Sequence, residues 1–321
     1  MKKSLAIIIS LALILSGCSA SKVSTTSAKD STQPNKSSTT STEDKKNTIT
    51  QVVQTAPTSQ KPVETSQTAE NSPKAVTPVV TNFTPVILNS TAGLKTQNTA
   101  WSWAYSPKSA APLLSKYFGY AFGDTSKKVI YLTFDEGYEN WYTASILDPL
   151  KKNDVHAAFF NTLPFVNGSY KGVQDTELLK RMMNEGHLIC NHSVQHKSMP
   201  SFLDEKSFDA EITGVENKVN SIPGLKMSKF FRPPMGDFSE LSLYYTQKLG
   251  YKSIFFSLAY TDYDTEHQPD PTAAKALLLK NTKPGMICLL HAVSKTNAEI
   301  LDSLLKEWKA QGYEFKTLDK L

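Results

Sequence analysis

The fold is decided by one stretch of sequence, Lys128-Val129-Ile130-Tyr131-Leu132-Thr133-Phe134-Asp135-Glu136-Gly137. Residues 129–134 are an unbroken run of apolar, β-branched and aromatic residues, which is typical of a strand buried on both faces. Two carboxylates follow the run directly. Because strands of this kind belong to parallel sheets covered by helices, the stretch predicts an α/β domain.

Strands and helices alternate from this stretch to the end of the chain. Further strands are expected at 155–160, 187–190, 229–231, 252–258, 286–290 and 313–316. The helical patterns cover 141–152, 175–185, 204–220, 239–249, 271–281 and 297–310. These repeated units predict a (β/α) barrel of about seven strands, distorted or incomplete, rather than an open sheet of about six strands.

Polar side chains follow several of the expected strands at their carboxyl ends. They are Asp135, Glu136, His192, His196, Arg232, Asp262 and His291. Ligands of parallel β/α proteins bind at this end of the strands. We therefore expect these side chains to meet on one rim of the barrel.

The two histidines His192 and His196 are separated by three residues. If that segment makes a helical turn, both imidazoles point to one place. With one carboxylate they would form the two-histidine, one-carboxylate set of a catalytic zinc site. Such pairs also occur by chance on solvated helices, so the spacing alone leaves both interpretations open.

The adjacent acids Asp135 and Glu136 are costly to bury without partners. One of them could ligate a cation while the other accepts a proton from bound water. The alternative is a helix N-cap followed by a solvated acid. Arg232 precedes the rigid pair Pro233-Pro234, which would hold its guanidinium in place for a carboxylate, although a surface arginine on a turn is the alternative.

Five motifs, in order, resemble those of the polysaccharide deacetylases of carbohydrate esterase family 4, over residues 127–321. They are Thr133-Phe134-Asp135-Glu136-Gly137-Tyr138-Glu139-Asn140, Asn191-His192-Ser193-Val194-Gln195-His196, Phe231-Arg232-Pro233-Pro234-Met235-Gly236, Ser257-Leu258-Ala259-Tyr260-Thr261-Asp262-Tyr263 and Leu289-Leu290-His291-Ala292. Within the family the chain looks most like the delta-lactam-biosynthetic de-N-acetylases, which act on N-acetylmuramic acid in peptidoglycan.

The resemblance implies a role for each polar residue at the strand ends. The catalytic set would be Asp135 as general base, His291 as general acid, Arg232 orienting Asp135, and Asp262 tuning His291. The metal set would be Glu136, His192 and His196 around a divalent cation, with zinc expected and cobalt, nickel or manganese as alternatives. That cation would polarise the acetamide carbonyl and lower the pKa of its bound water.

Two departures from the family pattern concern the site. The wider family usually has Asp-Asp where this chain has Asp135-Glu136, and the extra methylene moves the ligating oxygen by ~1.5 Å. Glu136 is therefore the least secure of the implied ligands, although the muramic-acid subgroup tends to show the Asp-Glu form. Tyr263 stands where the family usually has tryptophan.

The function implied by the resemblance is hydrolysis of the N-acetyl group of N-acetylmuramic acid in peptidoglycan, followed by formation of the muramic delta-lactam of spore cortex. One alternative keeps the chemistry and changes the sugar to N-acetylglucosamine, in peptidoglycan or a chitin-like glycan. Another is a non-catalytic glycan-binding lipoprotein. The second alternative is disfavoured because the base and both metal histidines are present.

The first eighteen residues resemble a bacterial lipoprotein signal peptide. Two lysines precede a short apolar run, and Leu15-Ser16-Gly17-Cys18 looks like a lipobox, in which Cys18 is lipidated. The run is too short to span a bilayer. We expect an exported protein that is lipid-anchored to the outer face of the membrane; an ordinary signal peptide with an incidental cysteine is the alternative.

Composition divides the rest of the chain. All 32 aromatic residues lie from Phe83 onward, and 24 of the 62 residues in 19–80 are Ser or Thr, which predicts a disordered linker there. Residues 81–126, with Trp101 and Trp103, would pack on the catalytic domain 127–321 or lengthen its substrate groove.

Charge and cysteine usage exclude further classes of function. Of the net charge of +5, residues 1–82 carry +4, so the aromatic-bearing part is near neutral and a nucleic-acid partner is not expected. Cys190 and Cys288 both lie in apolar runs, which indicates core residues rather than a redox pair. We expect a monomer whose partners are a peptidoglycan strand and, through Cys18, the membrane.

Overall fold

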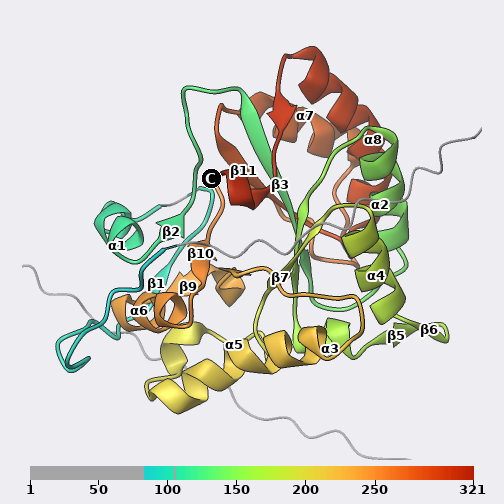
Figure 1. Ribbon diagram of the computed structural model, residues 1–321. Helices are drawn as coiled ribbons and strands as arrows, with labels where there is room; N and C mark the ends of the chain where they lie inside the picture. Colours follow the sequence, from blue (N-terminus) through green and yellow to red (C-terminus); the bar gives the residue numbers. More distant parts are fainter. Residues whose placement is uncertain (1–82, 105) are drawn as a thin grey trace, which may run out of the picture. The chain divides into compact units, whose positions relative to one another are not determined.

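The computed structural model describes residues 83–104 and 106–321 (Figure 1). The predicted signal peptide 1–18 with Cys18 and the predicted linker 19–80 lie outside the described residues. So do residues 81, 82 and 105 of the predicted extension. Among the residues that are described, no helix is long and apolar enough to cross a membrane.

One sheet of eight strands organises the domain, and all of its pairings are parallel. Its spatial order is β11-β3-β4-β7-β8-β10-β2, and β12 pairs with the start of β3. The strands are β2 (Gly119–Tyr120), β3 (Val129–Glu136), β4 (Ala158–Asn161), β7 (Leu188–Asn191), β8 (Phe230–Phe231), β10 (Lys252–Ile254), β11 (Met286–His291) and β12 (Glu314–Phe315). Seven of these are the strands expected from the sequence.

The two edges of the sheet are joined by isolated bridges. Phe122, just after β2, bridges to Met286 of β11, and Leu258, after β10, bridges to Cys288. The sheet thus closes into a distorted barrel, which confirms the predicted fold. The strand that the sequence did not reveal is β2, which precedes the alternation of strands and helices that starts at residues 128–137.

Helices surround the sheet (Figure 1). They are α1 (Ala110–Lys116), α2 (Thr143–Lys152), α3 (Leu163–Val166), α4 (Thr176–Asn184), α5 (Glu205–Asn220), α6 (Glu240–Lys248), α7 (Pro271–Asn281) and α8 (Lys295–Ala310). Neighbours contact one another in two series, α7-α8-α2-α4 and α3-α5-α6-α1. Several begin where a side chain caps free backbone N–H groups, as Asp204, Ser239, Asp270 and Ser294 do for α5, α6, α7 and α8.

Residues of β3 alternate between two cores. Val129 and Tyr131 belong to a small apolar cluster of strand residues inside the barrel. Ile130, Leu132 and Phe134 belong to the large cluster between strands and helices. Because successive strand residues point to opposite faces, the same alternation directs Asp135 into the barrel and Glu136 outward to the helices.

The segment before the barrel is held against its rim. Strand β1 (Thr99–Ala100) pairs with β9 (Asp237–Phe238), and the Trp101 backbone N–H donates to the Gly236 carbonyl at 3.0 Å. Elsewhere in the described residues, a hairpin of β5 (Ser169–Tyr170) and β6 (Val173–Gln174) forms a second small sheet. Gly236 has a φ of +71°, and a Cβ there would lie 2.4 Å from the Trp101 carbonyl oxygen.

Substituting Gly236→Ala should therefore destabilise the domain for two reasons, the positive φ and the clash of the new Cβ with Trp101. The matched control is Gly224→Ala, because Gly224 also has positive φ (+82°) but nothing within 4 Å of a new Cβ. We expect a loss of about 1 kcal/mol for the control and of about 2–4 kcal/mol for Gly236→Ala, measured by urea unfolding. Equal losses would show that β1 does not pack against this turn.

Candidate active site

Five of the predicted residues line one cavity of about 790 Å³ at the carboxyl ends of the strands. They are Asp135, His192, His196, Arg232 and His291. Asp262 is fully buried directly behind His291, with its Oδ1 2.7 Å from the His291 Nδ1. The structure therefore brings six of the seven side chains together, and Glu136 is the exception.

The Asp135 carboxylate lies between two basic groups. Its Oδ1 accepts a hydrogen bond from Arg232 Nη1 at 2.6 Å, and its Oδ2 lies 3.4 Å from His192 Nε2. Burial, the largest influence, acts to raise the pKa of Asp135, but the charge of Arg232 and the hydrogen bond from Arg232, with the charge of His291 added, lower it overall. Asp135 is thus an ionised carboxylate at neutral pH, able to accept a proton.

The Arg232 guanidinium is held on all sides. Its Nε donates to the Ile254 carbonyl at 3.2 Å and its Nη2 to Thr133 Oγ1 at 2.9 Å. Its central carbon lies 4.1 Å from the centre of the Phe160 ring. These contacts hold the guanidinium of Arg232 against the Asp135 carboxylate.

His291 is oriented by a short hydrogen-bonded chain. Asp262 accepts from the His291 backbone N–H at 2.8 Å as well as facing Nδ1 of the ring. Asn297 Nδ2 donates to Asp262 Oδ2 at 2.6 Å, and Tyr260 Oη donates to Asn297 Oδ1 at 2.5 Å. With Nδ1 occupied by Asp262, Nε2 is the nitrogen left to the cavity that the ring lines.

The pKa of His291 is raised. Burial acts to lower it, but the charge of Asp262 and the hydrogen bond to Asp262 outweigh burial, and the charge of Asp135 adds to them. Asp135 and His291 are direct neighbours in the β3–β11 register. An ionised carboxylate therefore lies beside a histidine whose raised pKa lets it keep its proton to a higher pH than an ordinary histidine.

The two remaining histidines do not lie on a helical turn. Their segment is irregular, with positive φ at Ser193 (72°) and His196 (52°), and it still brings the two ring centres to 4.8 Å. Glu211 of α5 supports this loop by accepting from the Gln195 backbone N–H at 2.9 Å and from its side chain at 2.6 Å. The two rings therefore lie close together without the helical turn on which the sequence interpretation depended.

Glu136 does not join the histidines. It is fully buried on the outer face of β3, where both carboxyl oxygens lie 3.5 Å from Thr143 Oγ1 of α2. Burial, and then the charges of Glu139 and Asp135, raise its pKa well above the usual range. The structure contradicts the predicted ligand set because adjacent residues of one strand face opposite sides.

A divalent cation fits only part of this arrangement. His192 Nδ1 lies 2.8 Å from the Arg232 carbonyl, which directs Nε2 into the cavity in the manner of a ligating histidine. Burial, the leading cause, lowers the pKa of His192 to about 4, so the ring is neutral. Across residues 83–104 and 106–321, however, no three His, Cys, Asp or Glu side chains are arranged to hold a metal ion.

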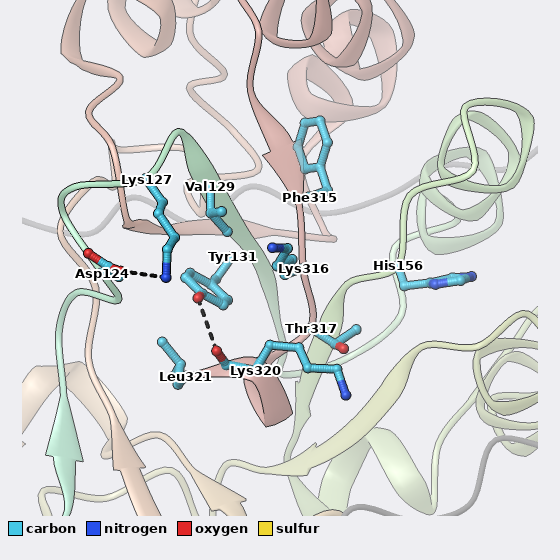
Figure 2. Close-up of a pocket in the computed structure, with 10 residues that line it drawn as sticks. All are labelled: Asp124, Lys127, Val129, Tyr131, His156, Phe315, Lys316, Thr317, Lys320 and Leu321. Carbon is cyan, nitrogen blue, oxygen red and sulfur yellow. Dashed lines mark hydrogen bonds and ion pairs between the residues drawn. The ribbon is translucent and has the colours of Figure 1, made fainter.

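A second cavity, of about 500 Å³, lies at the opposite end of the barrel, where β3 begins (Figure 2). Its lysines include Lys127, which forms an ion pair of 2.8 Å with Asp124, and Tyr131 Oη donates to the Lys320 carbonyl at 3.3 Å. None of the predicted site residues lines it. In β/α barrels this end of the strands contributes to stability rather than to catalysis.

Several residues of the site were missed by sequence reasoning. Thr133 is a polar residue in an otherwise apolar strand, and this could have singled it out in the sequence. Its hydroxyl accepts a hydrogen bond from Arg232. Tyr260 lies inside the fourth motif and Asn297 lies beyond the fifth, but no spacing rule singles out either residue. Glu211 looks like any helical glutamate in the sequence, although it is buried.

Comparisons with known proteins agree with this geometry. The family model described as polysaccharide deacetylase matches residues 122–254. The chain is 42% identical over 209 residues to the peptidoglycan-N-acetylmuramic acid deacetylase PdaA of Bacillus subtilis, covering 65% of this chain and 77% of that protein. It is 46% identical over 209 residues to an uncharacterised 30.6 kDa protein of Geobacillus stearothermophilus, covering 65% and 76% of the two chains.

A solved structure gives the same result. The structure of Bacillus subtilis PdaA, described as a family 4 carbohydrate esterase, matches with a TM-score of 0.65 and 38% identity, over 70% of this chain and 97% of that one. The chain therefore belongs to the polysaccharide deacetylase family, hydrolases that act on N-acetyl amide groups.

Proposed function

We propose that this protein removes the acetyl group from N-acetylmuramic acid residues of peptidoglycan. The observation that carries the proposal is the pairing of Asp135, ionised by Arg232, with His291, whose proton is stabilised by Asp262, at one cavity. The 42% identity to a peptidoglycan-N-acetylmuramic acid deacetylase supports this sugar over N-acetylglucosamine. The freed amine would then close on the lactyl carboxyl to give the muramic delta-lactam of spore cortex.

The residues divide the proton transfers between them. Asp135 accepts a proton from water as the water oxygen attacks the acetamide carbonyl, and Arg232 keeps the carboxylate aimed at it. His291 donates a proton to the amide nitrogen as the C–N bond breaks, because an unprotonated amine leaves poorly. The products are acetate and the free amine of the sugar.

His192 and His196 are the protein groups that we propose for a divalent cation. Two neutral imidazoles suit zinc, and cobalt, nickel or manganese could replace it according to supply. Glu136 is not part of this proposal, since it faces α2. We also propose that the protein acts as a monomer outside the membrane, held there by a lipid on Cys18.

Replacing the proposed base tests the function directly. Asp135→Asn should reduce acetate release from peptidoglycan strands by at least about 10²-fold, because general base catalysis of that size is lost. The matched control is Asp148→Asn, since Asp148 also pairs with an arginine, Arg181 at 2.6 Å, but on the surface. The control should keep full activity.

Mass spectrometry of the digested product would identify the sugar that loses its acetyl group, on strands with and without peptide stems. Deacetylated glucosamine alone would replace the proposed substrate. Undiminished release by Asp135→Asn, at a temperature where circular dichroism shows the variant folded, would remove the mechanism.

The pH dependence of acetate release tests the proposed role of His291 as general acid. His291 must be protonated to act, and its raised pKa keeps it so to higher pH; activity is lost as the pH rises through that pKa. Asp262→Asn removes the raising charge, so the alkaline limb of the kcat profile should move to lower pH. Asp264→Asn is the control, because Asp264 pairs with the exposed His267 at 3.0 Å. An unmoved alkaline limb in Asp262→Asn would contradict the role.

Metal content tests the corrected ligand set. Glu136→Gln should leave the bound metal unchanged, because this side chain lies against Thr143 rather than in the cavity. His196→Ala should lower the metal content by about 10-fold or more at limiting metal. Both variants would be measured by elemental analysis after dialysis against a weak chelator. Equal loss of metal in the two would restore Glu136 as a ligand.

A further inference from the structure

The rim of the active-site cavity carries an exposed tryptophan from outside the barrel. Trp103 lines the cavity and leaves 42% of its surface exposed. Among the residues that the structure describes, its ring stacks on no other aromatic ring, so one part of the indole packs on the domain and the rest is open to the cavity. A large apolar surface left open beside a catalytic site indicates a binding surface.

The backbone that presents Trp103 is firmly held. Two residues earlier, Trp101 is buried, and its indole N–H donates to the Phe256 carbonyl at 2.7 Å. Its ring lies 5.3 Å from that of Phe255. Together with the β1–β9 pairing, these contacts fix the backbone on the rim up to Trp101, two residues before Trp103, so only a short length of chain is left to order when Trp103 binds a ligand.

The chemistry of the cavity changes from floor to rim. The floor is charged and polar, with Asp135, Arg232 and the histidines. The rim is apolar, because Trp103, Tyr138, Met235 and Tyr263 all line the cavity and are all exposed. A pyranose ring matches both regions, since it has apolar C–H faces and a polar edge of hydroxyl and acetamide groups.

Tyr263 and Trp103 lie at different parts of the rim. The Tyr263 ring lies 5.5 Å from that of His291, so it adjoins the sugar whose acetamide is hydrolysed. Asp135, His192 and Arg232 line the same cavity but are buried, whereas Trp103 is exposed on its rim and belongs to the segment before the barrel. A strand whose reacting sugar lies over the buried groups extends across this rim, where the next sugar can stack on Trp103.

We propose that Trp103 forms a second saccharide subsite, which binds the sugar unit adjacent to the one that is deacetylated. The inference rests on the proposed function in requiring a glycan strand as ligand. It makes the segment before the barrel part of substrate recognition, and it predicts that affinity rises with the length of the strand.

The test is a length series of peptide-free peptidoglycan strands, from two to eight sugars, with acetate release as the readout. In the parent protein KM should fall as the strand lengthens. Trp103→Ala should raise KM for the long strands about 3- to 10-fold, with kcat unchanged and the smallest effect on the shortest strand hydrolysed. Trp103→Phe should restore most of the lost affinity.

The matched control is Trp141→Ala. Trp141 is also exposed, at 53%, but it does not line the cavity and instead lies 5.3 Å from the Tyr170 ring. This variant should keep the parent's dependence on length. An unchanged length dependence in Trp103→Ala, or a loss of kcat with KM unaltered, would overturn the subsite.

Failure of the proposed function gives a different result. If the parent releases no acetate from any strand, the deacetylation proposal fails, and the subsite is then judged by calorimetric titration of the eight-sugar strand. Binding weakened about 3- to 10-fold in Trp103→Ala but not in Trp141→Ala would support the subsite. Equal affinities of the parent and Trp103→Ala, or no binding to the parent, would overturn it.

Discussion

The buried ion pair between Asp135 and Arg232 is the constraint on which the site depends. Either charge alone would be costly in the barrel interior, because removing one partner of such a pair costs about 3–5 kcal/mol. The guanidinium also needs partners for its other N–H groups and finds them on Ile254 and Thr133. The end of β3, the residue after β8 and the end of β10 are thereby tied to one another, so the Asp135 carboxylate is positioned by the sheet.

Strand alternation then separates two adjacent acids into different environments. Asp135 faces a cation and stays ionised, whereas Glu136 faces the helix side with Glu139 and Asp175 among its electrostatic neighbours. The pKa of the first is lowered and that of the second is raised, although they are the same kind of group one residue apart. A ligand role for Glu136 would require β3 to twist its last residue to the other face.

The sequence was most informative where patterns were long or chemically distinctive. The buried run of β3 and the helical periods predicted the barrel, and polar residues at strand ends predicted most of the site. The short strands β1, β2 and β9 were missed because they lie outside the regular alternation of strands and helices, whereas β8 and β12, equally short, lie within it. The His192 loop depends on positive φ at Ser193 and His196, which no residue-type pattern announces. Asn297 could not be singled out because its role is a tertiary contact with Asp262.

One turn connects catalysis to the segment before the barrel. Arg232 points inward to Asp135, Met235 follows on the rim with a φ of 58°, and Gly236 accepts the close approach of Trp101. Each position requires its own backbone conformation, and Pro233 and Pro234 restrict the chain between them. The segment that carries Trp103 and the guanidinium that holds Asp135 are therefore attached to opposite ends of the same short turn.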